Sequence, residues 1–326
     1  MEIHKITEIL VDLKNIDDRP GPYCMSFGFN PEPLIQSIKR IGLVNPPLVV
    51  ENRQGKMTII IGYRRIQALK SLGWDKIPCK ILSKSELSPL ECLLLNLHDN
   101  IATRKLNEVE KGMVLCRLES YIKRTEILEQ YMPLLDLPSH EHTLVFFMKL
   151  EKDLEKDIKE YLTQRHLSLG TAKVLLEMDL ESRKQVFHLI SSIKFNINQQ
   201  SQLLDYLFDL SNISDKPIYE ILEQHPFKSI CSDTRLNNPQ KANALLQQLK
   251  AKRFPTLRQA EITFKNKVLS LGLPKDIRIN APPYFEASHY RLEVLFKDGK
   301  ELIKKIKSLS GIGELKELRN PWEENT

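Results

Sequence analysis

The stretch from Ile59 to Trp74, IIIGYRRIQALKSLGW, constrains the fold most tightly, because it changes from a strand pattern to a helix pattern within one residue. Three consecutive isoleucines are typical of a buried strand, whereas Ile66, Leu69 and Leu72 recur at helical spacing. The glycine that follows Leu72 stands where a helix normally ends. Gly62 is therefore predicted to be the hinge between a strand and a helix over 63–72.

Two cations occupy an unexpected place in this helix. Arg64 and Arg65 fall in its first turn, where the helix dipole already creates positive potential. An anion held by the free backbone N–H groups of that turn would offset both charges. The sequence thus predicts an anion site at Gly62.

Strand and helix patterns alternate through the first hundred residues. Strands are predicted over 8–16, 47–51, 57–61 and 77–82, and helices over 31–42 and 63–72. Ser88 and Glu91 are spaced as a capping box, with Pro89 at the first helical position, and they predict a helix reaching about residue 97. The segment 99–112, DNIATRKLNEVEKG, is predicted to be a polar loop that leads into the next helix through a second capping box, Asn107 and Glu110.

The remainder of the chain is mostly helical in pattern. Helices continue to about residue 193, with Ser139 and Ser168 as expected N-caps, and 237–272 is predicted to form two helices divided at Pro255. The segment from 273 predicts two strands and a helix. We therefore predict an α+β protein with a mixed α/β domain over 1–106, a helical domain over 107–193, a basic helical region over 194–272 and a small α+β unit over 273–326.

Composition and charge narrow the classes of function. No apolar run of the 326 residues approaches the roughly 20 needed for a membrane span, and the first ten residues lack a signal-peptide layout, so a cytoplasmic protein with no membrane partner is expected. Five cysteines without metal-ligand spacing are interpreted as reduced thiols. Residues 127–193 hold 8 Lys and Arg against 11 Asp and Glu, whereas 237–275 holds eight cations and one acid. A DNA-binding role is therefore favoured more by the second segment than by the first.

Three ordered segments carry a family resemblance: SIKRIGLVNPP, GYRRIQA and DNIATRKLNEVE. In this order and spacing they resemble the ParB/sulfiredoxin superfamily, and within it the ParB-like partition proteins of the ParB/RepB type. LSLGTAKVLLEM over 167–178 resembles the helix that follows the ParB helix-turn-helix. The resemblance covers roughly residues 3–190 and implies a ParB/sulfiredoxin-type first domain.

The resemblance implies a DNA-binding protein that binds CTP and Mg²⁺ and acts in plasmid or chromosome partition or in transcription. Gly62, Tyr63, Arg64 and Arg65 would hold the triphosphate. Asn45 and Pro46 would lie beside the base. Asp99 and Asn100 would stand near the metal and the phosphates, with Arg104 one place later than the arginine of the family pattern. Thr103 at that family position and Glu108 in place of a proline leave nucleotide hydrolysis, as a weak CTPase, open.

The resemblance also implies a helix-turn-helix, here degenerate, with helices over about 126–135 and 139–149. Its DNA-facing residues would be Ser139, His140, His142, Thr143 and Lys149. The basic region adds Lys250, Lys252 and Arg253 as candidate DNA contacts. A homodimer formed through the C-terminal unit, a partner partition ATPase and association with the nucleoid are further expectations. A small closed α+β lid is an equal alternative for the C-terminal unit.

Other interpretations stay open at this point. Arg64 and Arg65 could be solvated surface cations, Asn107 and Glu110 could serve only as helix caps, and 237–275 could be a solvated helix face. Sulfiredoxin activity is disfavoured because Tyr63 stands where that chemistry needs a cysteine. A ParB-fold nuclease, a nucleotide-dependent small-molecule kinase and a nucleotide-free adaptor are the alternative functions.

Overall fold

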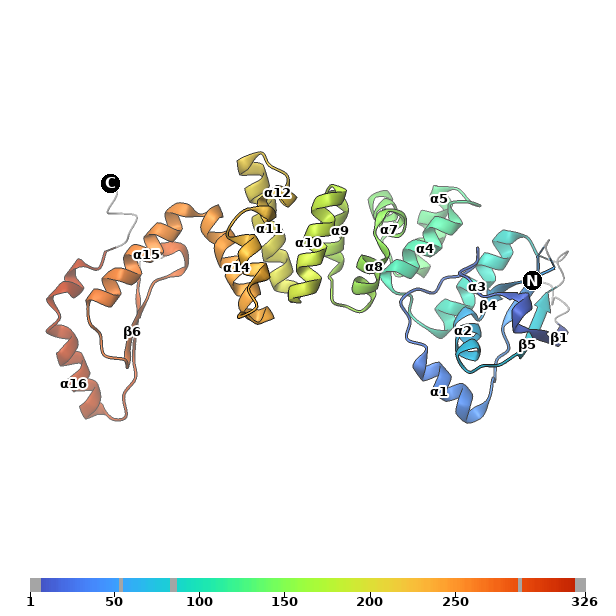
Figure 1. Cartoon of the computed structure of the whole chain (residues 1–326), viewed down its shortest axis with the longest axis horizontal. Coiled ribbons are helices and arrows are strands. Elements are labelled where there is room, and N and C mark those ends of the chain that lie inside the picture. Colours follow the sequence, from blue (N-terminus) through green and yellow to red (C-terminus); the bar gives the residue numbers. More distant parts are fainter. Residues whose placement is uncertain (1–6, 53–54, 83–86, 287–288, 320–326) are drawn as a thin grey trace. The chain divides into compact units, whose positions relative to one another are not determined.

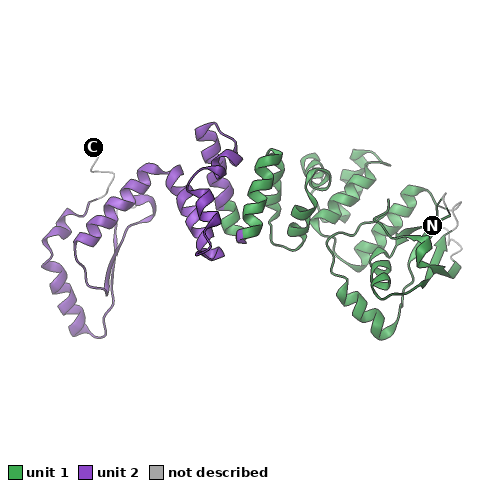
Figure 2. Cartoon of the chain, viewed as in Figure 1, with its two compact units in different colours: residues 1–192, 196–201 green, residues 193–195, 202–326 purple. Residues whose placement is uncertain are grey.

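The computed structural model describes residues 7–52, 55–82, 87–286 and 289–319 (Figure 1). Contacts divide the chain into two compact units, one of residues 1–192 with 196–201 and the other of residues 193–195 with 202–326 (Figure 2). Part of the connection between the strands predicted over 47–51 and 57–61 lies outside the described residues, as do the last seven residues of the predicted unit over 273–326. We describe the two units separately.

The first unit begins with a mixed five-stranded sheet in the order β1-β5-β3-β4-β2. Its strands are β1 (Thr7–Asp12), β2 (Ile16–Asp17), β3 (Leu48–Glu51), β4 (Met57–Ile61) and β5 (Lys76–Leu82). β1 runs antiparallel to β5, and β4 antiparallel to β3, whereas β3 runs parallel to β5. The predicted alternation of strands and helices is confirmed, with β1 and β2 dividing the expected first strand.

Helices cover both faces of this sheet. The first face holds α1 (Glu32–Ile41) and α2 (Tyr63–Ser71), whose Ile38, Ile66 and Leu69 pack on Val49 and Ile77. The opposite face packs against α3 (Pro89–Thr103). These apolar layers fix the strand ends and the first turn of α2 in one place, which is what a binding site at Gly62 requires.

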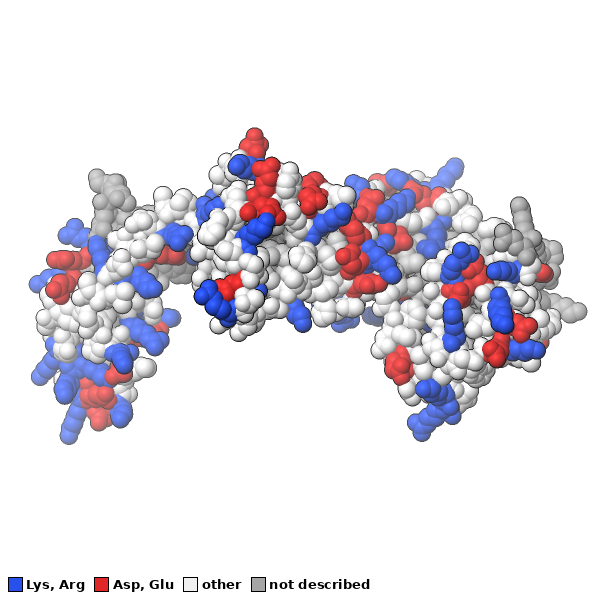
Figure 3. Space-filling model, viewed as in Figure 1, with Lys and Arg blue, Asp and Glu red and all other residues white. Residues whose placement is uncertain are grey.

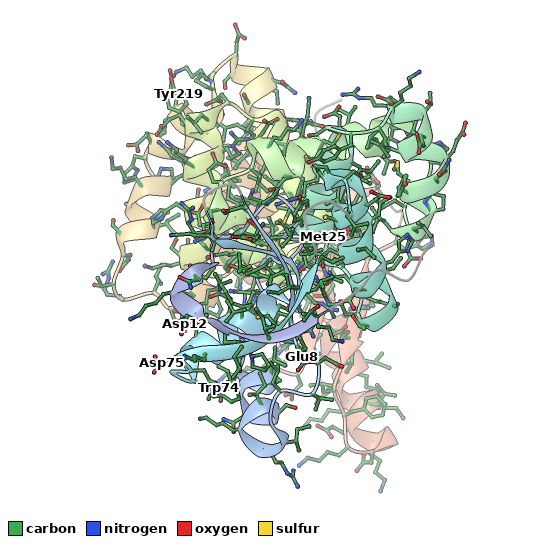
Figure 4. All side chains as sticks on the ribbon, turned by 90° about the vertical axis from the view of Figure 1, so that its right-hand side faces the viewer. Glu8, Asp12, Met25, Trp74, Asp75 and Tyr219 are labelled. Carbon is green, nitrogen blue, oxygen red and sulfur yellow. The ribbon has the colours of Figure 1, made fainter. Side chains whose placement is uncertain are left out.

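At the edge of the sheet, the end of β1 meets the turn that precedes β5. The N–H of Leu13 donates to the carbonyl of Asp75 over 2.9 Å, and Asp12 pairs with Lys76 in the strand register. Figure 4 shows Asp12, Trp74 and Asp75 close together at this edge. The contact ties the start of the chain to the end of α2.

The rest of the first unit is helical around a second core. Its helices are α4 (Glu108–Leu118), α5 (Arg124–Glu126), α6 (Met132–Leu134), α7 (Glu141–Asp153), α8 (Lys156–Thr163), α9 (Leu169–Glu177) and α10 (Leu180–Ile193), with a π-helical turn at Ile127–Tyr131. Leu115, Met132, Leu144 and Phe147 belong to the core cluster. The apolar residues Leu144, Phe147 and Met148 of the predicted recognition helix therefore face this core.

The second unit contains α12 (Ile218–Glu223), α13 (Phe227–Ser232), α14 (Asn238–Arg253) and α15 (Pro255–Ser270), which follow α11 (Ile197–Ser214). It ends with a two-stranded antiparallel sheet, β6 (Ile277–Asn280) and β7 (Arg291–Val294), and with α16 (Gly299–Ser310). Short 3-10 turns occur at Leu13–Asn15, Pro283–Phe285 and Gly313–Glu317. The division of α14 from α15 at Pro255 and the small α+β unit are as predicted.

Two local predictions are wrong. α3 continues to Thr103 instead of ending near residue 97, so only 104–107 remain of the predicted loop over 99–112. In the prolonged part, the side chains of Asn100 and Thr103 donate to carbonyl groups of the preceding turn. The N-cap of α7 is His140 and not Ser139, since the bond from the N–H of His140 to the carbonyl of Pro138 keeps the chain in a turn there.

The capping predictions at the other helices hold. Ser88 with Glu91 and Asn107 with Glu110 both form complete capping boxes, and Ser168 caps α9. The five cysteines are free thiols, three of them buried. Along the described part of the chain, no helix combines the length and apolar character needed to cross a membrane.

Candidate nucleotide-binding cavity

A cavity of about 720 Å³ lies in the first unit beside the hinge at Gly62. Its walls come from the ends of strands β4 and β5, the start of β3, the first turn of α2 and the last two turns of α3. All nine residues predicted to contact nucleotide line it: Asn45, Pro46, Gly62, Tyr63, Arg64, Arg65, Asp99, Asn100 and Arg104. The fold thus brings together three segments that are far apart in the sequence.

Gly62 shapes the floor of the cavity. It is the N-cap of α2 with φ 100°, a left-handed value that residues with a Cβ rarely adopt. A Cβ at this position would lie 3.1 Å from the Cα of Pro47. Since glycine has no side chain to cap the helix, the amides of the first turn of α2 have no such acceptor. This is the arrangement that the sequence predicted for an anion site.

Arg65 lies across the mouth of the first turn. Its Nη1 donates to the carbonyl oxygen of Asn45 over 2.5 Å and more distantly to that of Pro46. Burial lowers the pKa of Arg65, and the negative charge of Asp99 opposes that shift. Among the described residues no hydrogen bond uses its Nε or Nη2, so these N–H groups are available to a ligand.

Glu110 organises the other two arginines of the cavity. Its carboxylate is 1% exposed and accepts from Arg64 Nη2 over 2.6 Å and from Arg104 Nη1 over 2.5 Å. It also accepts from the backbone N–H groups of Phe27 and Asn107. The pKa of Arg64 is lowered by burial and by the neighbouring Arg104, while Glu110 counteracts both effects. The sequence predicted Glu110 as a helix cap, and its ion pairs are a finding of the structure.

Arg104 has a mainly structural position. It follows the last residue of α3 with an extended backbone, and its Nε donates to Asn100 Oδ1 over 2.7 Å. Its Nη2 donates to the carbonyl of Met25 over 2.8 Å. With Nη1 on Glu110, each nitrogen of this guanidinium has a protein acceptor, which leaves fewer donors for a ligand than Arg65 has.

Asp99 and Asn100 also differ in how far protein partners occupy their side chains. Asn100 is held on both sides, because its Nδ2 donates to Asn96 and its Oδ1 accepts from Arg104. Asp99 is half-buried at the cavity wall, and its carboxylate takes part in no hydrogen bond among the described residues. Asp99 is therefore the better-placed oxygen donor for a cation. The described residues contain no cluster of three or more His, Cys, Asp or Glu that could hold a metal alone.

A segment before α1, Tyr23–Phe29, closes one side of the site and was missed by the sequence analysis. Ser26 Oγ accepts from Arg64 Nε over 3.2 Å, and the ring of Phe29 lies 4.9 Å from the Arg64 guanidinium carbon. Gly28 packs against Thr163 of α8, where a Cβ would lie 2.3 Å from the Thr163 hydroxyl. The aromatic pair around a glycine in SFGFN was the available signal.

The predicted DNA-contacting residues fall in two separate places. Ser139, His140, His142 and Lys149 are exposed around α7 and Thr143 is half-buried, and the two histidine rings stack 5.3 Å apart. In the second unit the three basic-region residues all have partners. Lys250 pairs with Glu261 at 3.0 Å, Lys252 bonds Gln224 at 2.7 Å, and Arg253 pairs with Asp209 at 2.8 Å.

Comparisons with known proteins show which proteins the chain resembles. Residues 27–100 match the family model described as the ParB N-terminal domain. The probable chromosome-partitioning protein ParB of Vibrio cholerae is 27% identical over 218 residues, which cover 66% of this chain and 71% of that protein. The nucleoid occlusion protein of a Geobacillus species is 27% identical over 188 residues, covering 57% of this chain and 64% of that protein.

Among solved structures, the C-terminally truncated chromosome-partitioning protein ParB from Caulobacter crescentus complexed with CTP-gamma-S is 22% identical with a TM-score of 0.26. The match covers 56% of this chain and 99% of that one. The resemblance predicted from the ordered motifs is confirmed. Residues 27–100 match the ParB N-terminal domain, and the chain is similar to chromosome-partitioning and nucleoid occlusion proteins.

Proposed function

We propose that this chain is a DNA-binding protein of chromosome partition or nucleoid occlusion that binds CTP with Mg²⁺ in the cavity at Gly62. The sequence relatives named for these two processes support the cellular role. The observation that carries the nucleotide proposal is the uncapped first turn of α2, with Arg64 and Arg65 on the wall of a 720 Å³ cavity. Such a volume lies within the usual range for a small-ligand pocket.

The phosphates would lie at the start of α2. Backbone amides at a helix N-terminus and guanidinium groups bind phosphate oxygens through charge-assisted hydrogen bonds. Lys80 also lines the cavity, so four cations face a single lining carboxylate, that of Asp99. Asp99 would hold Mg²⁺ together with phosphate oxygens, which is how this ion is usually bound beside a nucleotide.

The base would lie toward Asn45 and Pro46, where Leu34 and Leu48 supply apolar wall. The Asn45 carbonyl is already bonded to Arg65, so base discrimination would use the Asn45 side chain.

Calorimetry with the four nucleoside triphosphates and Mg²⁺ tests this proposal. We expect CTP to bind best and Arg65→Ala to weaken binding by roughly tenfold or more, since it removes a charge-assisted contact worth about 1.5–3 kcal/mol. Arg40→Ala, which changes an exposed arginine on α1, is the matched control and should bind as wild type. No heat with any nucleotide would instead favour an adaptor that keeps the fold without the ligand.

DNA would be bound by the exposed start of α7 and by the basic end of α14. The first residues of a recognition helix commonly contact base edges, which suits His140 and His142. Lys250, Lys252 and Arg253 would add phosphate contacts, although each would exchange a protein partner for the phosphate. Figure 3 shows basic and acidic residues interspersed over the surface in this view.

Fluorescence anisotropy over a range of salt concentrations separates the two DNA contributions. Alanine at Lys250, Lys252 and Arg253 should lower affinity and reduce the slope of log affinity against log salt, because fewer counterions are released. Alanine at His140 and His142 should reduce preference for one sequence over another and leave the slope nearly unchanged. A triple variant with wild-type affinity and slope would exclude the α14 patch.

The C-terminal unit would form a homodimer. Its two-stranded sheet has unpaired edges among the described residues, and Leu295, Phe296, Ile303 and Ile306 are each at least half exposed. Exposed apolar side chains beside open strand edges are typical of a surface that associates. Ile303→Glu with Ile306→Glu should give a monomer by light scattering, whereas Lys304→Glu with Lys307→Glu on the same helix should remain dimeric.

A further inference from the structure

A second cavity, of about 800 Å³, lies in the first unit away from the hinge at Gly62. Four parts of the chain enclose it: the turn from α3 to α4, the end of α6, the end of α8 and the start of α9. Arg104 lines both cavities and separates them, since its guanidinium is bonded to Glu110 and to the Met25 carbonyl. The second cavity is therefore a distinct site with its own walls.

The inner wall of this cavity is apolar. Leu106, Leu162 and Leu167 line it and are 8%, 7% and 2% exposed. Leu134 lies at the rim and is 43% exposed. Full burial of a leucine side chain contributes roughly 1.5–3 kcal/mol of favourable free energy, and an exposed leucine lacks part of it. An apolar ligand that covered Leu134 would recover that part.

The rim carries an excess of positive charge. Lys105 and Arg165 are exposed, and among the described residues neither side chain forms a hydrogen bond or an ion pair. The other cations are already engaged, Lys111 by Glu108 at 3.7 Å and Arg104 by Glu110. Asp136 is the one further acid among the lining residues. Two unpaired cations beside a leucine-lined hollow are complementary to an apolar molecule with one acidic group.

The same cavity lacks the features expected for a polyphosphate. The helix that starts at its wall, α4, is already capped by Asn107 and Glu110, and α9 is capped by Ser168. No uncapped helix turn of the kind at Gly62 therefore faces it. The ligand class differs from the one proposed for the first cavity.

We propose that this second cavity binds a small amphipathic anion. The apolar body would pack on the leucines, and the carboxylate, sulfonate or phosphate group would pair with Lys105 and Arg165. The inference does not depend on nucleotide binding, because it uses none of the groups that face the first cavity.

Two fluorescent probes with the same aromatic body test the proposal on the full chain. Anilinonaphthalene sulfonate carries a negative charge, and phenylnaphthylamine does not. We expect both to bind saturably, and we expect Lys105→Glu with Arg165→Glu to weaken the sulfonate by roughly tenfold, or about 1.4 kcal/mol. The neutral probe should bind this double variant as it binds wild type. Leu134→Asn should weaken both probes.

Matched variants guard against binding elsewhere. Lys123→Glu with Lys149→Glu changes the same net charge at exposed positions outside the cavity and should leave both affinities unchanged. Arg65→Ala should also leave both unchanged, since it alters only the first cavity. Two results would overturn the proposal. One is an equal loss of sulfonate affinity in both charge-reversal variants. The other is wild-type sulfonate affinity in the variant with Lys105→Glu and Arg165→Glu.

Discussion

Arg64, Arg65 and Arg104 line one cavity but keep different numbers of N–H groups available. Arg104 uses all three of its guanidinium nitrogens on protein acceptors. Arg64 uses two, and Arg65 uses only Nη1. At the scale of single residues, the structure therefore separates a ligand-facing arginine, Arg65, from one that mainly positions its neighbours, Arg104.

Gly62→Ala should weaken nucleotide binding more than it weakens the fold. An alanine in the left-handed region costs about 1–2 kcal/mol, and here its Cβ would also press on Pro47 at the anion site. Gly73→Ala is the matched control, because Gly73 has φ 72° but nothing within 4 Å of its added Cβ. Urea unfolding should show a loss of stability for both variants, larger for Gly62→Ala because of the contact with Pro47, whereas calorimetry should show lost CTP affinity only for Gly62→Ala. If Gly62→Ala bound CTP as tightly as Gly73→Ala does, Gly62 would not have the proposed role at the phosphate site.

Glu110→Gln should destabilise the protein by about 2 kcal/mol. The neutral amide offers one acceptor oxygen to four donors and leaves Arg64 and Arg104 facing each other without the compensating charge. The figure is discounted because the two arginine side chains are 30% and 18% exposed. Glu91→Gln changes the equivalent capping carboxylate of α3 and should cost less than 1 kcal/mol in urea unfolding. Similar losses at both positions would show that Glu110 acts only as a cap.

The residue-scale features differ in how far the sequence could predict them. The sequence could predict the turn at Gly62, the helix after it and both capping boxes. Each of these features depends on residues spaced within four positions of one another. The pairing of Glu110 with Arg64 could not be predicted, since 46 residues separate the two and only the packed fold brings them together. The same holds for Ser26 and Phe29, whose partners lie in α2.

At the scale of helices and strands, α4 and α7 cross closely. This crossing packs α4, which carries Glu110, against the helical core. Gly112 makes this crossing possible, since a Cβ there would lie 2.5 Å from the Phe147 carbonyl oxygen. The sequence pattern of each segment predicted its own helix. It could not show that α4 and α7 cross at Gly112. The length of α3 was misjudged for a related reason: a polar sequence such as DNIAT gives no helical periodicity, while its side chains bond back to the preceding turn.

Gly112→Ala should destabilise the protein by about 1–3 kcal/mol despite the better helix propensity of alanine, because the helices must separate to admit the methyl group. Gly170→Ala in α9 is the control, since its added Cβ would meet only Ser168 Oγ at 3.7 Å. That variant should be neutral or slightly more stable in urea unfolding. A Gly112→Ala protein as stable as the control would contradict the packing described for α4 and α7.

At the scale of the whole chain, the cysteines report on the integrity of both units. Burial raises the pKa of Cys79 and Cys116 to about 11, and it also raises the pKa values of Cys24, Cys92 and Cys231. Since the thiolate is the reactive form, native thiols should be scarcely ionised at neutral pH. The composition had suggested reduced thiols, and the structure adds why they would be unreactive.

Thiol labelling with Ellman's reagent tests this expectation. At pH 8 the folded chain should react slowly. The pH is then about three units below the pKa of Cys79 and Cys116, so roughly one molecule in a thousand carries either thiol ionised, and burial also disfavours the thiolates of the other three cysteines. The rate should keep rising above the ordinary pKa of about 8.5. All five thiols should react promptly in denaturant. A fast native burst would contradict the burial described for whichever cysteine mass spectrometry then identified.

Amide hydrogen exchange with and without CTP and Mg²⁺ shows whether the first turn of α2 holds the phosphates of a nucleotide. We expect added protection at the amides of Tyr63, Arg64 and Arg65, with little change in α16. Binding of CTP that leaves these three amides exchanging at their unliganded rate would contradict this expectation.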